Sequence, residues 1–312
     1  MSRQPKSAPA PSSAPTSEVA RWYAARKPAA SAVPIGNPSG PRVAIQGEPG
    51  SFSHEAALKL VPDACIVPCS VSAEVFDALA SGSVEAAAVP IENSLAGSVL
   101  EHFDLLLSHD VLVERETLLR IRHNLIAMPG VAVDQVRRVF SHPVALAQCK
   151  RYLAAHLHME PFAFYDTAGS VKQLVELRDT HAAAVASQAA ARFYGADILE
   201  AFIEDNPENY TRFFLVRRAA DAAVDPAANK LSLAFSLKNQ PGSLVRALSQ
   251  LSALGTNLSK IESRPVHGKP WEYIFYVDCQ IASSEEADRA IAALQPLCPM
   301  LKILGRYREA SR

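Results

Sequence analysis

Short apolar runs alternate with stretches of helical spacing between about residues 42 and 217 of the chain. One such stretch places Val75, Phe76 and Leu79 on one helical face after a possible N-cap at Ser72. This alternation predicts an α/β domain with largely parallel sheets, whose functional loops leave the carboxyl ends of the strands. The predicted strands are residues 41–47, 65–68, 86–91, 139–140, 162–165 and 182–186.

The pattern changes after a small-residue linker at residues 218–228. The order of the elements beyond it is β-α-β-β-α-β, the ferredoxin-like arrangement, which predicts a second domain at residues 229–310. Because such a sheet leaves one edge strand unpaired, we expect a homodimer or homotetramer that forms through this domain. The predicted strands are residues 231–237, 257–266, 271–281 and 301–304, with helices after Gly242 and Ser283.

Residues 1–41 are rich in Ala, Pro and Ser, and Glu18 is their only acid. We expect a disordered tail, because this segment cannot bury much apolar surface. Its scattered basic residues also suit a transit peptide, so a cytoplasmic location and the plastid stroma both stay open. No apolar run of about 18 residues is present, so no membrane span is predicted.

Charge and cysteine content narrow the function classes. The 31 basic and 32 acidic residues give a net charge of -1, which does not favour nucleic acid or an anionic membrane as a partner. Cys65 and Cys69 have three residues between them and no histidine nearby, so they do not predict a zinc site. We expect all 5 cysteines to be reduced, most of them buried, and no metal to be bound.

Two polar clusters follow predicted strands in the first domain. The segment from Gly47 to Glu55 carries Ser51 and Ser53 at the start of a helix, with Ser53 as the expected N-cap. Backbone N–H groups there favour an anion, although the segment also fits a plain turn. Glu92, Asn93 and Ser94 follow the strand at residues 86–91, and they fit the floor of a pocket.

Two further clusters are weak when taken alone. His142, between Ser141 and Pro143 and upstream of Gln148, is more typical of a structural or capping group than of a catalytic one. No serine has a G-x-S-x-G setting, which argues against a Ser–His hydrolase. Thr211 lies in the polar entry to a strand, where threonine is common for its β propensity alone.

Taken together and in this order, these four runs and a fifth in the C-terminal domain resemble prephenate dehydratase over about residues 42–310. The matching motifs are Gly47 to Ser53, Pro90 to Ser94, Ser141-His142-Pro143 with Gln148-Cys149, and Thr211-Arg212-Phe213. The C-terminal part is similar to an ACT domain, a small-molecule sensor, through Glu262-Ser263-Arg264-Pro265. Its companion motif is Gly242-Ser243-Leu244, where Gly-Ala-Leu is usual.

The resemblance implies a two-lobed catalytic domain of the periplasmic-binding-protein-like (type 2) class, followed by a ferredoxin-like βαββαβ ACT domain. Lobe one would comprise about residues 42–121 and 205–217, and lobe two about residues 122–204. The chain would therefore cross between the lobes twice. No metal and no organic cofactor is implied.

The implied reaction converts prephenate to phenylpyruvate in L-phenylalanine biosynthesis, with loss of carbon dioxide and water. Thr211 would assist the departing hydroxyl as one donor in a hydrogen-bonded network with Asn93, Gln148 and Glu92. Further substrate contacts are implied for Ser51, Ser53, Ser94, Ser141, Thr167, Ala168, Gly169, Arg212 and Phe213. Allosteric L-phenylalanine would bind at Gly242, Ser243, Leu244, Asn257, Leu258, Glu262, Ser263, Arg264 and Pro265.

Two other functions stay open at this point. Arogenate dehydratase performs the same chemistry on the amino analogue of prephenate, and no single residue of the sequence excludes it. A non-catalytic small-molecule-binding protein would share the two-lobed architecture. The lack of a secretory signal and the intact run from Thr211 to Phe213 argue against that second alternative.

Overall fold

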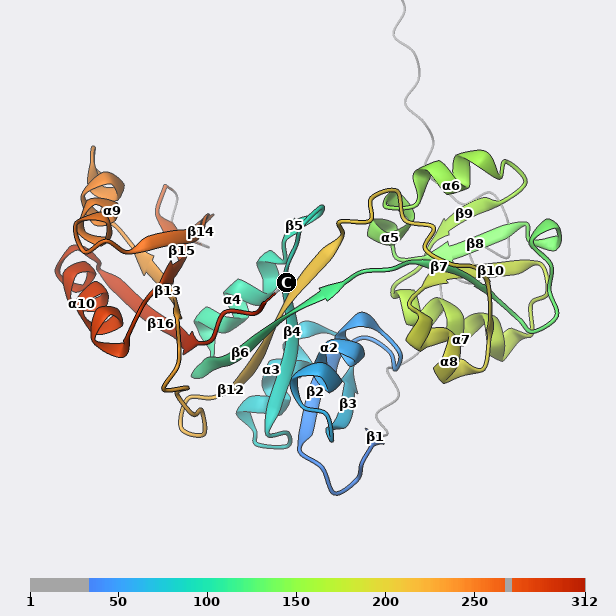
Figure 1. Ribbon diagram of the computed structural model, residues 1–312, viewed down its shortest axis with the longest axis horizontal. Coiled ribbons are helices and arrows are strands. Elements are labelled where there is room, and N and C mark those ends of the chain that lie inside the picture. Colours follow the sequence, from blue (N-terminus) through green and yellow to red (C-terminus); the bar gives the residue numbers. More distant parts are fainter. Residues whose placement is uncertain (1–33, 267–270, 312) are drawn as a thin grey trace, which may run out of the picture.

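The computed structural model describes residues 34–266 and 271–311. Three units follow one another along the length of the molecule (Figure 1). The segment that begins in blue lies in the middle, the green and yellow segment forms one end, and the orange and red C-terminal unit forms the other. We call these the first lobe, the second lobe and the C-terminal unit.

The first lobe is built on strands in the order β1-β3-β2-β4-β12-β6, with the short β5 beside β4. Helices α2 and α3 belong to the strand–helix alternation that the apolar pattern predicts. The bounds are β1 Ile35–Gly36, β2 Arg42–Gln46, α2 Phe52–Leu60, β3 Cys65–Cys69, α3 Ser72–Ala80, β4 Ala86–Asn93, β5 Gly97–Ser98, α4 Leu100–Ser108, β6 Val111–Arg120 and β12 Tyr210–Arg218.

The second lobe has its own five-stranded sheet, in the order β11-β7-β10-β8-β9. The chain enters it after β6 and returns to the first lobe in β12, so it crosses between the lobes twice. The bounds are β7 Asn124–Ala127, the 3-10 turn Val133–Gln135, β8 Arg138–Ser141, α5 Pro143–Ala147, α6 Lys150–Ala155, β9 Glu160–Ala163, α7 Thr167–Leu177, β10 Ala182–Ala186, α8 Gln188–Tyr194 and β11 Asp197–Glu200.

The C-terminal unit has the predicted βαββαβ order, with strands arranged β16-β13-β15-β14. Its β14 is therefore an edge strand. The bounds are β13 Lys230–Ser236, α9 Ser243–Ala253, β14 Asn257–Pro265, β15 Tyr273–Gln280, α10 Ser284–Leu294, the 3-10 turn Gln295–Leu297 and β16 Met300–Tyr307. The predicted turn at residues 267–270 lies outside the described residues.

A backbone pairing between two strands joins the C-terminal unit to the sheet of the first lobe. Gly305 of β16 pairs in parallel with Val113 of β6, so the two units share an eleven-stranded sheet. A Cβ atom at Gly305 would clash with the carbonyl oxygen of Val113. Glycine is therefore required where these two strands meet.

The structure corrects several predictions about local elements. The sheets are mixed and not largely parallel, because β12 runs antiparallel to both β4 and β6 as the chain returns from the second lobe. Ser51, not Ser53, caps α2, since its side chain accepts from the N–H of His54. Ser72 is the first residue of α3 and does not cap it. Regular structure begins before residue 41, because Ile35–Gly36 forms a short strand that pairs with β3.

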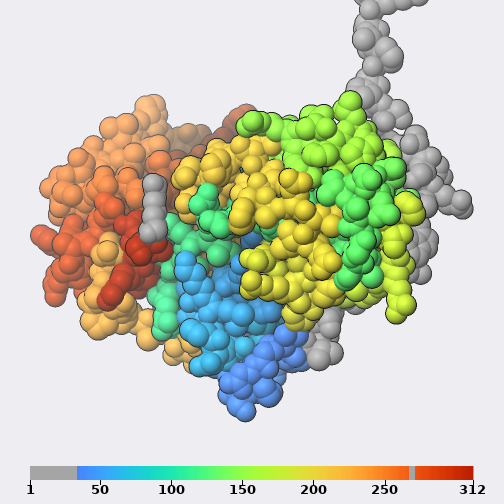
Figure 2. Space-filling view, turned by 45° about the vertical axis from the view of Figure 1, so that its right-hand side comes forward, coloured from blue at the N-terminus to red at the C-terminus, as the bar shows by residue number. Residues whose placement is uncertain are grey.

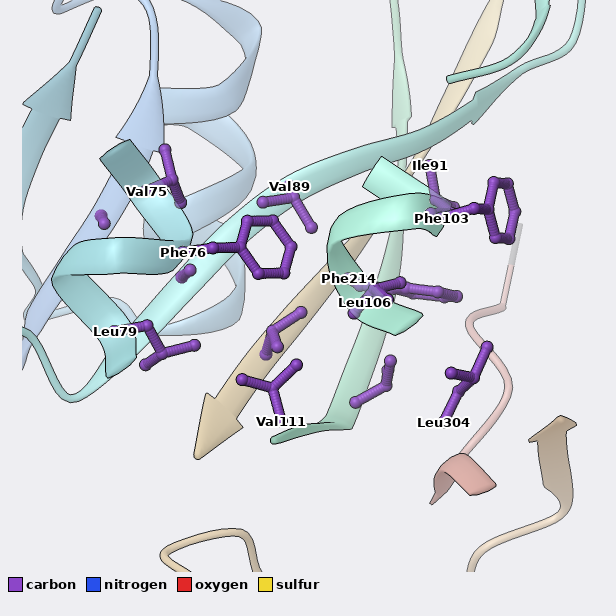
Figure 3. Packing of buried hydrophobic residues seen from close by; sticks show 14 of the residues in the cluster. Val75, Phe76, Leu79, Val89, Ile91, Phe103, Leu106, Val111, Phe214 and Leu304 are labelled. Atoms are coloured by element: carbon purple, nitrogen blue, oxygen red, sulfur yellow. The ribbon is translucent and has the colours of Figure 1, made fainter. Parts of the chain in front are cut away.

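The largest apolar cluster lies where the first lobe meets the C-terminal unit. Phe76 of α3 and Phe214 of β12 belong to it, and so does Leu304 of β16 (Figure 3). All three side chains are at most 2% exposed. This shared core joins the two units in addition to the pairing of β16 with β6. No helix among the described residues is long and apolar enough to cross a membrane.

We expect Phe76→Ala to lower the free energy of unfolding by about 3–5 kcal/mol, because it removes a fully buried ring and leaves a cavity. Leu157→Ala is the control, since Leu157 is 91% exposed and should change stability by less than about 0.5 kcal/mol. Urea unfolding followed by circular dichroism measures both values. Equal effects of the two substitutions would contradict this account of the core.

Candidate functional site between the two lobes

A cavity of about 470 Å³ lies between the lobes, and both lobes contribute to its walls. Figure 2 shows the second lobe, in green and yellow, lying directly against the first lobe, in blue. The lining of the cavity includes residues from the sequence motifs and from the ends of β4 and β12. They are Gln46, Gly47, Ser51, Phe52, Ser53, Ser70, Pro90, Asn93, Ala96, Gly97, Ser98, Val99, Ile121, His123, His142, Val144, Ala145, Gln148, Tyr165, Asp166, Thr167, Thr211 and Phe213.

Direct hydrogen bonds join the two lobes next to this cavity. The carboxylate of Glu48, 1% exposed, accepts from the Tyr165 hydroxyl at 3.0 Å and from Lys172 Nζ at 3.1 Å. The Ser187 hydroxyl donates to the carbonyl oxygen of Gly50 at 2.6 Å. A Cβ atom at Gly50 would lie 2.6 Å from the Cα atom of Ala190, so this loop approaches the second lobe as only glycine allows.

Side chains alternate between two environments where β4 pairs with β12. Thr211 lies opposite Asn93, and Arg212 lies opposite Glu92. The first pair lines the cavity. The second pair points to the other side of the sheet, where the C-terminal unit lies, because successive residues of a strand face opposite sides.

Asn93 has an orientation that the backbone fixes. Its Oδ1 accepts from the N–H groups of Leu95 at 3.0 Å and Ala96 at 2.8 Å, which can only donate. Its Nδ2 therefore faces Thr211 Oγ1 at 2.9 Å and donates to it. Because the Thr211 oxygen already accepts this bond, the hydroxyl hydrogen is free to point elsewhere. The arrangement leaves the Thr211 hydroxyl hydrogen available to the cavity that Thr211 lines.

The chain of hydrogen bonds continues with the same donor-to-acceptor direction into the second lobe. Asn93 Nδ2 also donates to Asn209 Oδ1 at 2.7 Å, so Asn209 Nδ2 donates to Gln148 Oε1 at 2.9 Å. His123 Nε2 lies 2.9 Å from that same oxygen of Gln148. The structure thus brings Thr211, Asn93 and Gln148 together, as the sequence predicts, and adds Asn209 and His123.

Neither added residue had a strong signal in the sequence. Asn209 lies two residues before the motif that starts at Thr211, in the same polar entry to the strand, and this position could have indicated it. His123 belongs to no motif and follows β6, after which the chain enters the second lobe. Only the crossing of the lobes brings it to Gln148.

Several predicted catalytic and substrate-binding residues lie elsewhere. Ser141 is fully buried, and its hydroxyl donates to the carbonyl oxygen of Val185 at 2.5 Å. The Ser94 hydroxyl donates to the carbonyl oxygen of Glu208 at 3.0 Å. Glu92 pairs with Lys260 at 2.9 Å. None of these three side chains lines the cavity. Ser51, Ser53, Thr167 and Phe213 do line it.

At the start of α7, where the resemblance implies substrate contacts for Thr167, Ala168 and Gly169, a backbone N–H group already binds a side chain of the protein. Asp166 caps this helix, and its Oδ1 accepts from the N–H of Gly169 at 2.6 Å. Ala168 and Gly169 are buried and do not line the cavity. Burial raises the pKa of Asp166 to about 6. His142 likewise has the expected capping role, since its side chain accepts from the N–H of Val144.

Arg212 anchors the C-terminal unit instead of contacting the cavity. Its guanidinium donates to Glu116 at 2.5 Å, to Asp278 at 2.5 Å and to the Tyr307 hydroxyl at 2.9 Å. Glu116, Asp278 and Tyr307 come from β6, β15 and β16, and all are buried. Lys230 adds a second cation on Glu116 at 2.9 Å. The expectation that Arg212 binds substrate is therefore wrong for this structure.

The predicted phenylalanine-binding residues lie in two separate places. Gly242 is the N-cap of α9, and Ser243 and Leu244 line a cavity of about 110 Å³ with Trp271 and Phe275. The second motif lies on β14, and none of its residues lines that cavity. Two of its side chains contact the first lobe: Glu262 accepts from the Ser98 hydroxyl, and Arg264 pairs with Asp104 at 2.9 Å. Asn257 donates to Gln280 on the neighbouring strand. The other predicted residues on β14 are Leu258, Ser263 and Pro265.

Two α/β lobes face each other across a cavity lined by hydroxyl and amide groups, apolar side chains and one carboxylate, an arrangement typical of a small-molecule site. Among the described residues, no group of His, Cys, Asp or Glu side chains is placed to hold a metal ion. The family model for prephenate dehydratase matches residues 43–221, and the chain belongs to this family.

Known relatives cover most of the chain. It is 40% identical over 286 residues to arogenate dehydratase/prephenate dehydratase 2, chloroplastic, of Arabidopsis thaliana, a match that covers 88% of this chain and 74% of that protein. The structure of prephenate dehydratase from Arthrobacter aurescens in complex with L-Phe has a TM-score of 0.79 at 32% identity and covers 86% of this chain and 90% of that chain. The predicted family and two-lobed fold class are confirmed.

A third relative carries a different activity in its name. A structure described as a novel type of quorum quenching acylase has a TM-score of 0.79 at 33% identity, and it covers 86% of this chain and 98% of that chain. Equal structural similarity to proteins with different named activities means that the fold alone does not decide the reaction. The side chains of the cavity must decide it.

We expect Arg212→Met to lower the free energy of unfolding by about 3–5 kcal/mol, because it leaves two buried carboxylates with one cation fewer. Arg115→Met is the matched control on the neighbouring strand. Arg115 is 62% exposed in its side chain and lies 3.8 Å from Glu114, so its loss should cost less than about 1 kcal/mol. Chemical unfolding measures both. A cost for Arg212→Met no larger than that of the control would refute the anchoring role.

Proposed function

We propose that this protein is a prephenate dehydratase in which Thr211 donates a hydrogen bond to the departing ring hydroxyl. The observation that carries the proposal is the direction of the bond between Asn93 and Thr211. Asn93 Nδ2 donates to the threonine oxygen at 2.9 Å, which leaves the hydroxyl hydrogen for a ligand in the cavity.

The reaction needs little covalent assistance from the protein. The bond from the ring to its carboxylate breaks and releases carbon dioxide, and its electron pair completes the aromatic ring as the C–O bond of the hydroxyl breaks. The departing oxygen gains negative charge, so a donor near it lowers the barrier. Aromatisation supplies the thermodynamic drive. Thr211 donates from within a network with Asn93, Asn209 and Gln148, and not as a solitary acid.

Substrate binding relies on neutral donors. Among the described residues, no Lys or Arg lines the cavity. The two carboxylates of prephenate would therefore be held by hydroxyl, amide and backbone N–H groups, among them Ser51, Ser53 and Thr167. Charge-assisted hydrogen bonds of this kind are stronger than those between neutral groups.

Arogenate is the second candidate substrate, and one observation favours it. Asp166 is the only carboxylate among the described residues that line the cavity. The ammonium group of arogenate could pair with it, whereas the keto group of prephenate could not. The plant relative named for both activities is consistent with either substrate.

The C-terminal unit is proposed to be an ACT domain that senses L-phenylalanine and inhibits the enzyme. Contacts from β14 to the first lobe support such coupling. Lys260 pairs at 2.9 Å with Glu92, which is the residue before Asn93. Glu262 accepts a hydrogen bond at 2.8 Å from Ser98, which lines the cavity. A change in β14 would thus reach the strand that orients Thr211. The expected coupling is about 1–3 kcal/mol.

Thr211→Ala tests the donor role. We expect kcat on prephenate to fall by about 10²–10⁴-fold, as for loss of acid assistance, with KM changed only a few-fold. Steady-state assays of phenylpyruvate formation give both constants. Thr211→Ser keeps the hydroxyl and should keep most of the activity. Near-normal turnover in the alanine variant would refute the assignment.

A side-by-side assay on prephenate and arogenate, with and without L-phenylalanine, tests substrate and regulation together. We expect prephenate to be turned over and L-phenylalanine to inhibit the native enzyme. Higher kcat/KM on arogenate would replace the first proposal with the second. Turnover of neither substrate would refute both.

The same assay on Arg264→Ala should show weaker inhibition than in the native enzyme. Arg289→Ala is the control, because Arg289 is exposed on α10 of the same unit and away from β14. Insensitivity of the native enzyme would remove the regulatory proposal. Equal inhibition of native enzyme and the Arg264 variant would remove Arg264 from it.

A further inference from the structure

His123 is a buried histidine at the point where the chain crosses from the first lobe into the second. It is 2% exposed, and it belongs to the cavity lining. Its ring meets Phe52 of α2 edge-on, with centroids 5.6 Å apart. The motifs that identify the family give it no role.

The neighbours of this imidazole select one neutral form. Gln148 Oε1 accepts from Asn209 Nδ2, so the nearby His123 Nε2 has to carry a hydrogen and donate to the same oxygen. His123 Nδ1 is buried and has no hydrogen-bond partner among the described residues. A proton on Nδ1 would be a buried donor without an acceptor, which disfavours the other tautomer and the cation. Burial also lowers the pKa of His123.

The bond from His123 has a direct effect on Gln148. With donors from both Asn209 and His123 on Oε1, a flipped amide would place its N–H groups against two other donors. The Gln148 Nε2 atom is therefore held on the opposite side of the amide. It lies 3.4 Å from Asn93 Oδ1, with its second hydrogen available to an oxygen in the cavity.

We propose that His123 is a positioning residue that acts through Gln148: together with Asn209 Nδ2, its Nε2–H fixes the amide so that Gln148 Nε2 donates to an oxygen of the substrate. The proposal rests on the proposed dehydratase function. It assigns to His123 neither proton transfer nor direct contact with the substrate.

A double-mutant cycle tests this role. His123→Phe keeps a ring beside Phe52 but deletes the donor, and we expect kcat to fall about tenfold, with KM changed less than about threefold. In a Gln148→Ala background, the same substitution should cause no further loss of kcat. His123→Gln restores an amide donor and should recover most of the activity in the native background.

His102→Phe is the matched control, because His102 is equally buried but bonds Pro90 and Ser72 away from Gln148. Its effect on kcat should be the same in both backgrounds. An equal loss from His123→Phe in native enzyme and in Gln148→Ala would overturn the proposal, and so would normal kcat in His123→Phe.

A second measurement does not depend on activity. Long-range ¹H–¹⁵N spectra of the native chain should show His123 with a protonated Nε2 and an unprotonated Nδ1 near neutral pH, and Gln148→Ala should shift the Nε2 signal. The Nδ1–H tautomer, or an imidazolium, would overturn the inference. If the native chain shows no dehydratase activity, the proposed function fails while these spectra still decide the contact between His123 and Gln148.

Discussion

The alternation of side chains where β12 pairs with β4 is the constraint on which the rest of the arrangement depends. One face of this pairing presents Thr211 and Asn93 to the cavity, and the other directs Arg212 and Glu92 to the C-terminal unit. Because neighbouring residues share one backbone, neither face can shift without the other. The buried ion pairs of Arg212 therefore hold β12 against the C-terminal unit, and they also fix the position of Thr211, the preceding residue of the same strand, in the cavity.

A second constraint is the direction of the hydrogen bonds in the cavity. It starts from two backbone N–H groups that hold Asn93, and it passes through side-chain amides to Thr211 on one side and to Gln148 on the other. Side-chain amides can turn over, but backbone donors cannot. Anchoring the network on the main chain gives a preorganised donor without a charged group, which suits the stabilisation of a departing oxygen.

Periodicity and motifs predicted much of this from the sequence. The apolar run Ala182–Ala186 is a strand with the predicted bounds, and the motifs led to Thr211, Asn93 and Gln148. Arg212 and Glu92 were misplaced because a motif does not say which face of a strand each residue takes. Ser141 was misplaced because its hydroxyl donates to the carbonyl oxygen of Val185 on the neighbouring strand β10. His123 escaped notice because its partner Gln148 lies in another element, across the crossing between the lobes.

The shared sheet also limits how copies of this chain can associate. In the described part of the chain, one end of the sheet is the nine-residue β14 and the other is the two-residue β1. An edge as short as β1 offers few groups for pairing, so extension of this particular sheet between copies would have to join β14 to β14. A contact of a surface with its own copy has two-fold symmetry and uses both edges at once. Assembly by this route is self-limiting: it stops at a pair and cannot grow into a filament.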